Sequence, residues 1–275
     1  MVGGVWATGM GFNGQGLNEY IDPMFPRLTA RRFPTFTGPL LPSRCEVCRS
    51  WPAEPVCQPC TARFAAPLPR CQHCAIPLPL DMSLELRIRP GVCMDCIVER
   101  PLLDHAFAAV TYAYPWSGLV GRYKFGEQPA WAPIFAALLL QTPGVTESMA
   151  ALDPADWIVP MPLSAQRLQT RGFNQAWQLA TALAVQSRSL ARADARLLLR
   201  VKDTRPQSQL KRAERLTNVK GAFLVDPLRS AEVNSRRVVL VDDVMTSGAS
   251  LFTAAAALKQ AGAAHVTAMV FARTD

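Results

Sequence analysis

The stretch VVLVDDVMTSGAS, residues 238–250, decides the fold class, because a buried-strand pattern runs directly into a binding-loop pattern. Four apolar residues lead to Asp242 and Asp243, and a helix is expected to follow at residues 250–261. In open α/β sheets, ligands bind at the carboxyl edge, where the strands end. We therefore expect the two aspartates to close a strand at residues 236–241 and to face a ligand.

The loop after the aspartates has the composition of a phosphate-binding site. Backbone amides at a helix N-terminus attract an anion, and small side chains let it approach closely. The candidate phosphate contacts are Thr246, Ser247, Gly248, Ala249 and Ser250. Carboxylates beside such a loop repel a phosphate unless they bind something else, and a pair of ribose hydroxyls fits them. The pattern favours a ribose 5-phosphate; the alternative is that the aspartates only end a strand and a hydroxyl caps the next helix.

The sequence on either side of this stretch alternates between strand-like and helix-like segments. Strands are expected at residues 105–114, 157–160, 196–201 and 265–271, and helices at 119–125, 133–141 and 173–190. Strands that alternate with helices of this length form parallel βαβ units. The fold class is therefore predicted to be α/β, with a doubly wound parallel sheet.

A second group of residues is suited to binding a pyrophosphate. These residues are Pro160, Met161 and Pro162 at the end of an expected strand, followed by Arg171 and Gly172. The Pro-x-Pro turn can expose backbone amides, the arginine offers a fork of donors, and the glycine permits close approach. The alternative is that Gly172 ends a turn and Asn174 caps the following helix.

Residues 196–220 contain eight basic and two acidic residues, including Arg200. Apolar residues at three-residue spacing make part of this segment an amphipathic helix. We interpret the segment as a mobile basic flap that closes over a polyphosphate. The alternative is an ordinary solvated basic face.

All eight cysteines lie in four C-x2-C pairs, namely Cys45 and Cys48, Cys57 and Cys60, Cys71 and Cys74, and Cys93 and Cys96. Both thiolates of a pair can face one ion, and two pairs complete a tetrahedral zinc site. The sequence predicts two structural Zn²⁺ ions rather than disulfides, which are rare in the cytoplasm. The pairs can combine sequentially or in an interleaved way, and sequential combination closes the shorter loops.

The distribution of cysteine also indicates how the chain divides. We expect a flexible Gly- and Pro-rich extension at residues 1–44, a zinc-binding module at 45–100 and the α/β domain at 101–275. The net charge of +8 favours phosphate-bearing partners but is too diffuse to indicate nucleic acid by itself. No apolar run reaches the roughly 20 residues of a membrane span, and the start of the chain does not resemble a signal peptide, so a cytoplasmic location is expected.

Two resemblances extend this interpretation. The stretch at residues 238–250 resembles the PRPP-binding motif of type I phosphoribosyltransferases, in which two acidic residues between apolar residues precede T-T/S-G-x-T/S. The cysteine pairs, Lys124-Phe125, PMPL, RGFNQ, the R-x3-T-x4-Q spacing from Arg200 and this motif together resemble the ComF/GntX family. That family combines a double zinc ribbon with a type I phosphoribosyltransferase-like domain.

The resemblance implies that Asp242 and Asp243 bind the ribose 2- and 3-hydroxyls, that residues 246–250 surround the 5-phosphate, and that Lys124 and Arg200 join the pyrophosphate contacts. It implies PRPP bound with Mg²⁺, and a link to natural competence and to the uptake or use of external DNA. The protein is then expected to be a phosphoribosyltransferase, with no catalytic residue, acceptor or oligomeric state assigned.

Two other functions remain open from the sequence: a DNA-binding accessory protein of the uptake machinery and a PRPP sensor without turnover. Single-stranded DNA and the competence helicase machinery are the partners considered. Residues 45–96 hold five basic and five acidic residues, which argues against the cysteine-rich module as the main DNA clamp.

Overall fold

The computed structural model describes residues 43–79, 91–126, 128–202 and 221–275. Almost all of the expected N-terminal extension, and residues 203–220 of the expected basic flap, lie outside the described residues. The described residues belong to one compact unit. The boundaries proposed at residues 44/45 and 100/101 stay predictions.

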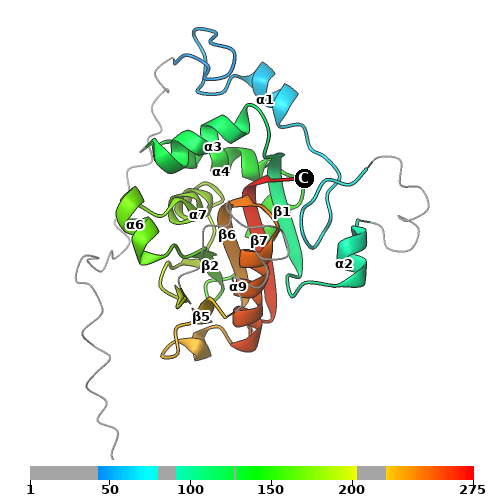
Figure 1. Ribbon diagram of the computed structural model, residues 1–275, viewed down its shortest axis with the longest axis vertical. Coiled ribbons are helices and arrows are strands. Elements are labelled where there is room, and N and C mark those ends of the chain that lie inside the picture. The colour runs from blue at the N-terminus through cyan, green and yellow to red at the C-terminus, as the bar shows by residue number, and fades with distance from the viewer. Residues whose placement is uncertain (1–42, 80–90, 127, 203–220) are drawn as a thin grey trace, which may run out of the picture. The chain divides into compact units, whose positions relative to one another are not determined.

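A five-stranded parallel sheet forms the centre of the fold (Figure 1). In spatial order its strands are β1 (His105–Thr111), β7 (His265–Arg273), β6 (Arg237–Met245), β2 (Trp157–Pro160) and β3 (Arg192–Ala193). β6 and β7 stay paired along their whole length, whereas β2 pairs with β6 only as far as Pro160, opposite Val241. The carboxyl end of β6 therefore projects past its neighbour β2.

Helices cover both faces of this sheet. The helices of this domain are α3 (Trp116–Phe125), α4 (Trp131–Leu140), α5 (Val145–Ala150), α6 (Ala165–Arg171), α7 (Gln175–Gln186) and α9 (Ala249–Gln260), with a 3-10 turn η3 (Ser230–Glu232). Val239 and Val241 pack with α3, α4 and α7, while Val238 and Leu240 pack with α9 on the opposite face. Alternate apolar residues of β6 thus face two different cores, and the predicted doubly wound α/β class is confirmed.

The structure differs from the sequence-based expectation in two strands. β6 continues to Met245, so Asp242 and Asp243 lie within the strand rather than after it, because β7 still supplies hydrogen-bonding partners there. The strand expected at residues 196–201 lies outside the parallel sheet: β4 (Leu198–Arg200) pairs antiparallel with β5 (Phe223–Val225). Short elements such as α6 and β3 were not expected, since seven residues or fewer carry little periodicity.

The cysteine-rich segment contains, among its described residues, only two short helices, α1 (Gln58–Phe64) and α2 (Met94–Val98). Several hydrogen bonds tie it to the sheet domain; in two of them, Ala106 N–H donates to the Gln72 carbonyl at 2.7 Å and the Trp116 indole donates to the Phe64 carbonyl at 2.7 Å. Throughout the part of the chain that the structure describes, every helix is too short or too polar to span a bilayer.

Candidate functional site

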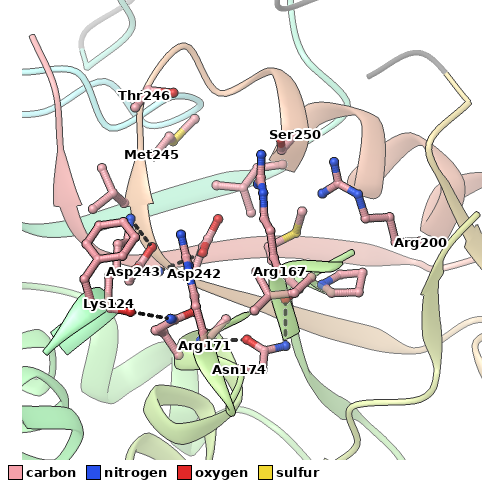
Figure 2. Close-up of a pocket in the computed structure, with 18 of the residues that line it drawn as sticks. Lys124, Arg167, Arg171, Asn174, Arg200, Asp242, Asp243, Met245, Thr246 and Ser250 are labelled. Atoms are coloured by element: carbon pink, nitrogen blue, oxygen red, sulfur yellow. Dashed lines mark hydrogen bonds and ion pairs between the residues drawn. The ribbon is translucent and has the colours of Figure 1, made fainter. Parts of the chain in front are cut away.

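A cavity of about 850 Å³ lies at the carboxyl edge of the sheet. Its walls come from the end of β6, the loop that leads into α9, the turn after β2, the helix α6, the end of α3 and Arg200 of β4. Figure 2 shows polar side chains from these separate elements gathered around one space. This is the edge at which open α/β sheets bind ligands.

Asp242 and Asp243 line the cavity because β6 extends beyond the last paired residue of β2 at this point. Asp242 Oδ1 accepts the Asp243 N–H at 2.9 Å. Lys124, near the end of α3, places its ammonium 3.1 Å from Asp243 Oδ1. The other oxygen of the buried Asp243 carboxylate, Oδ2, has no hydrogen-bond partner among the described residues. A buried carboxylate oxygen without a partner is costly, so this atom is suited to accept a ligand hydroxyl or to bind a cation.

The surroundings of Asp242 and Asp243 disfavour the ionisation of both carboxyl groups at once. Burial, together with the negative charge of Asp243, raises the pKa of Asp242 to about 8, against the opposing effect of Lys124. The shift favours the protonated form of Asp242 in the protein without ligand. A ligand that brings hydroxyl donors or a divalent cation would favour its ionised form.

The loop after β6 forms the N-terminus of α9. Gly248 is the N-cap residue and has a φ of +81°. A Cβ at this position would lie 2.6 Å from Met245 Cε and from Phe252 Cζ, so the loop requires glycine here. Thr246, Gly248 and Ser250 line the cavity, whereas Ser247 and Ala249 do not. α9 has 12 residues and begins at the cavity, which gives the loop the geometry of an anion site.

Three arginines approach the same cavity from other elements. Arg167 and Arg171 stand one turn apart on α6, which begins at the N-cap Ser164, and Arg200 comes from β4. Figure 2 shows Arg167 and Arg200 extended toward the Ser250 side of the cavity. Burial lowers the pKa of Arg171, while the charges of the two aspartates act in the opposite direction. The cavity thus combines a carboxylate side with a guanidinium side.

Some of the expected pyrophosphate contacts have a structural role instead. The Met161 N–H donates to the Val241 carbonyl at 2.8 Å, so the Pro-x-Pro turn does not offer this amide to a ligand. Met161 and Pro162 line the cavity, but Pro160 does not. Gly172 also lies outside the lining, with a φ of +75° at the end of α6, and Asn174 caps α7 by accepting the Ala176 N–H at 2.9 Å. The capping alternative thus describes how these two residues act in the fold.

Sequence reasoning left several cavity residues out of the predicted site, among them Tyr112, Phe125, Arg167 and Asn174. Arg167 had a usable signal, because Ser164 is a typical N-cap and arginines four residues apart share one helix face. Phe125 is exposed, and the Arg171 guanidinium lies 4.9 Å from the centre of its ring. Nothing local to Phe125 indicates this contact, since it joins α3 to α6.

The eight cysteines form two separate groups of four, and the sequential combination is the one observed. The members are Cys45, Cys48, Cys57 and Cys60 in the first cluster and Cys71, Cys74, Cys93 and Cys96 in the second cluster. Within each cluster the sulfur atoms all lie within 4.8 Å of one another. Backbone amides point at two of them: Cys57 N–H at Cys45 Sγ (3.4 Å) and Cys93 N–H at Cys71 Sγ (3.3 Å). Four convergent thiols with amide donors fit structural Zn²⁺, with no position left for substrate.

Known proteins with similar sequences agree with this architecture. A family described as "Phosphoribosyl transferase domain" matches residues 168–274. "DNA utilization protein YhgH" of Salmonella typhimurium is 30% identical over 239 residues, which cover 85% of this chain and 98% of the relative. "Competence protein F" of Haemophilus influenzae is 30% identical over 79% of this chain and 90% of its own. "Competence protein ComFC" of Bacillus subtilis is 29% identical over 191 residues, which cover 67% of this chain and 73% of the relative.

The parallel sheet, the cavity at its carboxyl edge and the matched family define a protein with a phosphoribosyltransferase domain. The 30% identity to relatives along nearly their whole length, together with the two four-cysteine clusters, identifies the family. The chain belongs to the ComF/GntX family.

Proposed function

We propose that the protein binds PRPP together with Mg²⁺ in this cavity and transfers the phosphoribosyl group to a nitrogen nucleophile. The observation that carries the proposal is the pairing of Asp242 and Asp243 with a glycine-dependent helix N-terminus on one side and three arginines on the other. Ribose hydroxyls, a 5-phosphate and a pyrophosphate are the three chemical features that such a set of residues can bind at once.

Each part of the site has a role in this proposal. The carboxylates accept the ribose hydroxyls, and the unpartnered Oδ2 of Asp243 is a ready acceptor. The α9 N-terminus binds the 5-phosphate, and Arg167, Arg171 and Arg200 bind the pyrophosphate. When the nitrogen lone pair forms its bond to ribose C1, the C1–O bond breaks and its electron pair leaves with the pyrophosphate. The arginines stabilise the negative charge that develops there.

Mg²⁺ would supply further charge neutralisation for the pyrophosphate, and carboxylates such as those of Asp242 and Asp243 are oxygen ligands of the kind it prefers. The protein's own contribution is orientation, since positioning two reactants lowers the barrier without an acid or base. The names of the relatives refer to competence and DNA utilization. We infer that this activity serves the uptake or use of external DNA, with single-stranded DNA or the competence helicase machinery as partners.

Calorimetric titration with PRPP, with and without Mg²⁺, tests the binding step. Arg167→Gln should weaken PRPP binding by about tenfold through loss of a charge-assisted contact. Arg236→Gln is the matched control: it removes the same charge at the amino end of β6, where Arg236 is exposed, and should leave the affinity unchanged. Equal affinity for both variants, or no PRPP binding by the wild type, would contradict the proposal.

Turnover is tested separately, by measuring pyrophosphate release with candidate nitrogen acceptors. Release that depends on an acceptor supports a transferase. PRPP binding without release for any acceptor would identify a sensor instead. Binding of DNA that falls steeply with salt and ignores PRPP would identify a DNA-binding accessory protein.

A further inference from the structure

The last residue of β7, Arg273, connects the second cluster to the loop that runs from the end of β6 into α9 at residues 246–250, here called the phosphate loop. Its side chain is buried, with 6% exposed. Its Nε donates to the Cys74 carbonyl at 2.8 Å, and Nη1 donates to the Met245 carbonyl at 3.4 Å and to the Thr246 carbonyl. Cys74 belongs to the second cluster, and Met245 and Thr246 are where β6 turns into the loop. One guanidinium therefore fixes two backbones that are far apart in the sequence.

The position of the Cys74 carbonyl depends on the shape of the turn that contains the C-x2-C pair Cys71 and Cys74. Cys71 N–H donates to the Ile76 carbonyl at 2.9 Å and Ala75 N–H to the Cys71 carbonyl at 2.8 Å, so the chain folds tightly around the two thiols. A four-thiolate metal site holds such a turn closed, because thiolates without metal repel one another. Loss of metal would therefore move the carbonyl that Arg273 binds.

The second cluster also shares a hydrophobic core with the loop. Cys71, Cys74 and Cys96 pack in the same hydrophobic core as Met245 and Ala249. The first cluster does not, since Cys45 and Cys60 pack with the core beneath α3 and α4. Among the described residues, the two clusters thus contact different parts of the domain, and the second cluster is the one adjacent to the phosphate loop.

We propose that the second cluster regulates ligand binding at the cavity, with Arg273 as the positioning residue. Metal bound by Cys71, Cys74, Cys93 and Cys96 sets the Cys74 carbonyl. Arg273 then holds the Met245 and Thr246 carbonyls, so that the α9 N-terminus faces the anion. This inference rests on the proposed function, because PRPP is the ligand whose affinity is regulated.

Linkage supplies a test that needs no variant. If metal at the second cluster raises PRPP affinity, PRPP must raise zinc affinity there by the same factor. Zinc-loaded protein is equilibrated with a chromogenic chelator, with and without PRPP and Mg²⁺, and free zinc in the same buffers corrects for binding by PRPP itself. We expect about half of the bound zinc to be retained at least fivefold more tightly with PRPP, a typical coupling between two sites.

The variant Arg273→Lys tests whether Arg273 couples the second cluster to the cavity. It keeps the charge but loses the planar fork that reaches several carbonyls at once. PRPP affinity should fall about fivefold, and zinc affinity should no longer respond to PRPP. Arg229→Lys is the matched control, because Arg229 makes comparable forked contacts to Glu232 and Asp194 beside Trp157, which begins β2 at the opposite end of the sheet. This control should keep the response to PRPP.

The outcomes separate the two proposals. If the zinc-loaded wild type does not bind PRPP, the proposed function fails and this inference fails with it. If PRPP binds but zinc retention is the same with and without it, only the regulatory inference is overturned, whether or not Arg273→Lys folds. A response that survives in a folded Arg273→Lys protein would overturn the role of Arg273.

Discussion

The ammonium of Lys124 lies 3.1 Å from Asp243 Oδ1, so the end of α3 is joined to the end of β6 by an ion pair inside the candidate site. From the resemblance, Lys124 was expected among the pyrophosphate contacts. In the structure without ligand it lines the cavity and forms an ion pair with one of the two carboxylates. This pairing offsets part of the cost of placing the buried carboxylate of Asp243 next to that of the partly buried Asp242.

Lys124→Met should destabilise the protein without ligand by about 3 kcal/mol, because it leaves the buried Asp243 carboxylate without its cation. Adding Asp243→Asn in the same chain should restore most of that stability, since no unpaired charge remains. Chemical denaturation of the two single variants and the double variant gives the coupling energy. Additive effects would show that the ion pair contributes nothing to the fold.

Asp242→Asn should stabilise the protein without ligand, and the gain should grow with pH. The folded protein raises the pKa of Asp242 from 3.8 to about 8, so between these values the unfolded chain binds fewer protons than the folded one. Wild-type stability is therefore lost as pH rises through this window, and asparagine removes that loss. The advantage of the variant should increase on the order of 2 kcal/mol between about pH 5.5 and about pH 7.5.

The same substitution should weaken PRPP binding by about tenfold or more, since asparagine cannot supply a charged acceptor. Denaturation curves at several pH values, each compared with wild type, measure the stability change, and calorimetry measures the affinity. A stability difference that does not vary with pH would show that Asp242 titrates normally. Unchanged affinity would remove Asp242 from the ribose contacts.

Gly248→Ala should impair both folding and binding. The positive φ and the 2.6 Å approach of its Cβ to Met245 Cε and Phe252 Cζ require the loop to shift. We expect a loss of roughly 1–3 kcal/mol and reduced PRPP affinity. Gly118→Ala is the control, because Gly118 lies in α3, is exposed, and a Cβ added there would meet nothing within 4 Å. It should stabilise the protein by about 0.5–1 kcal/mol; similar behaviour of the two variants would argue against a required backbone conformation.

Metal analysis of the purified protein should find about two zinc ions per chain, one for each cluster. Cys57→Ser should lose the zinc of the first cluster, and that module should unfold because its short helices cannot hold it together alone. Mass spectrometry under native conditions counts the ions directly. A well-folded wild-type protein that contains no metal would contradict the assignment.

The sequence by itself determined the features that depend on residues close together in the chain. The C-x2-C spacing indicated two metal sites because both thiols of a pair sit on one turn, and the alternation of strand and helix patterns indicated the parallel sheet. The apolar residues that lead to Asp242 and Asp243 indicated which strand end faces the cavity. Of the seven residues predicted to surround the ribose and 5-phosphate, five line the cavity.

Only the tertiary structure decided which remote groups meet. β6 extends through both aspartates because β7 continues beside it, and Met161 uses the amide that the turn was expected to offer. Arg273 reaches Cys74 from the other end of the chain. Such contacts depend on strand register and on helix packing, which are set by the whole core, and a local pattern of residue types carries no record of them.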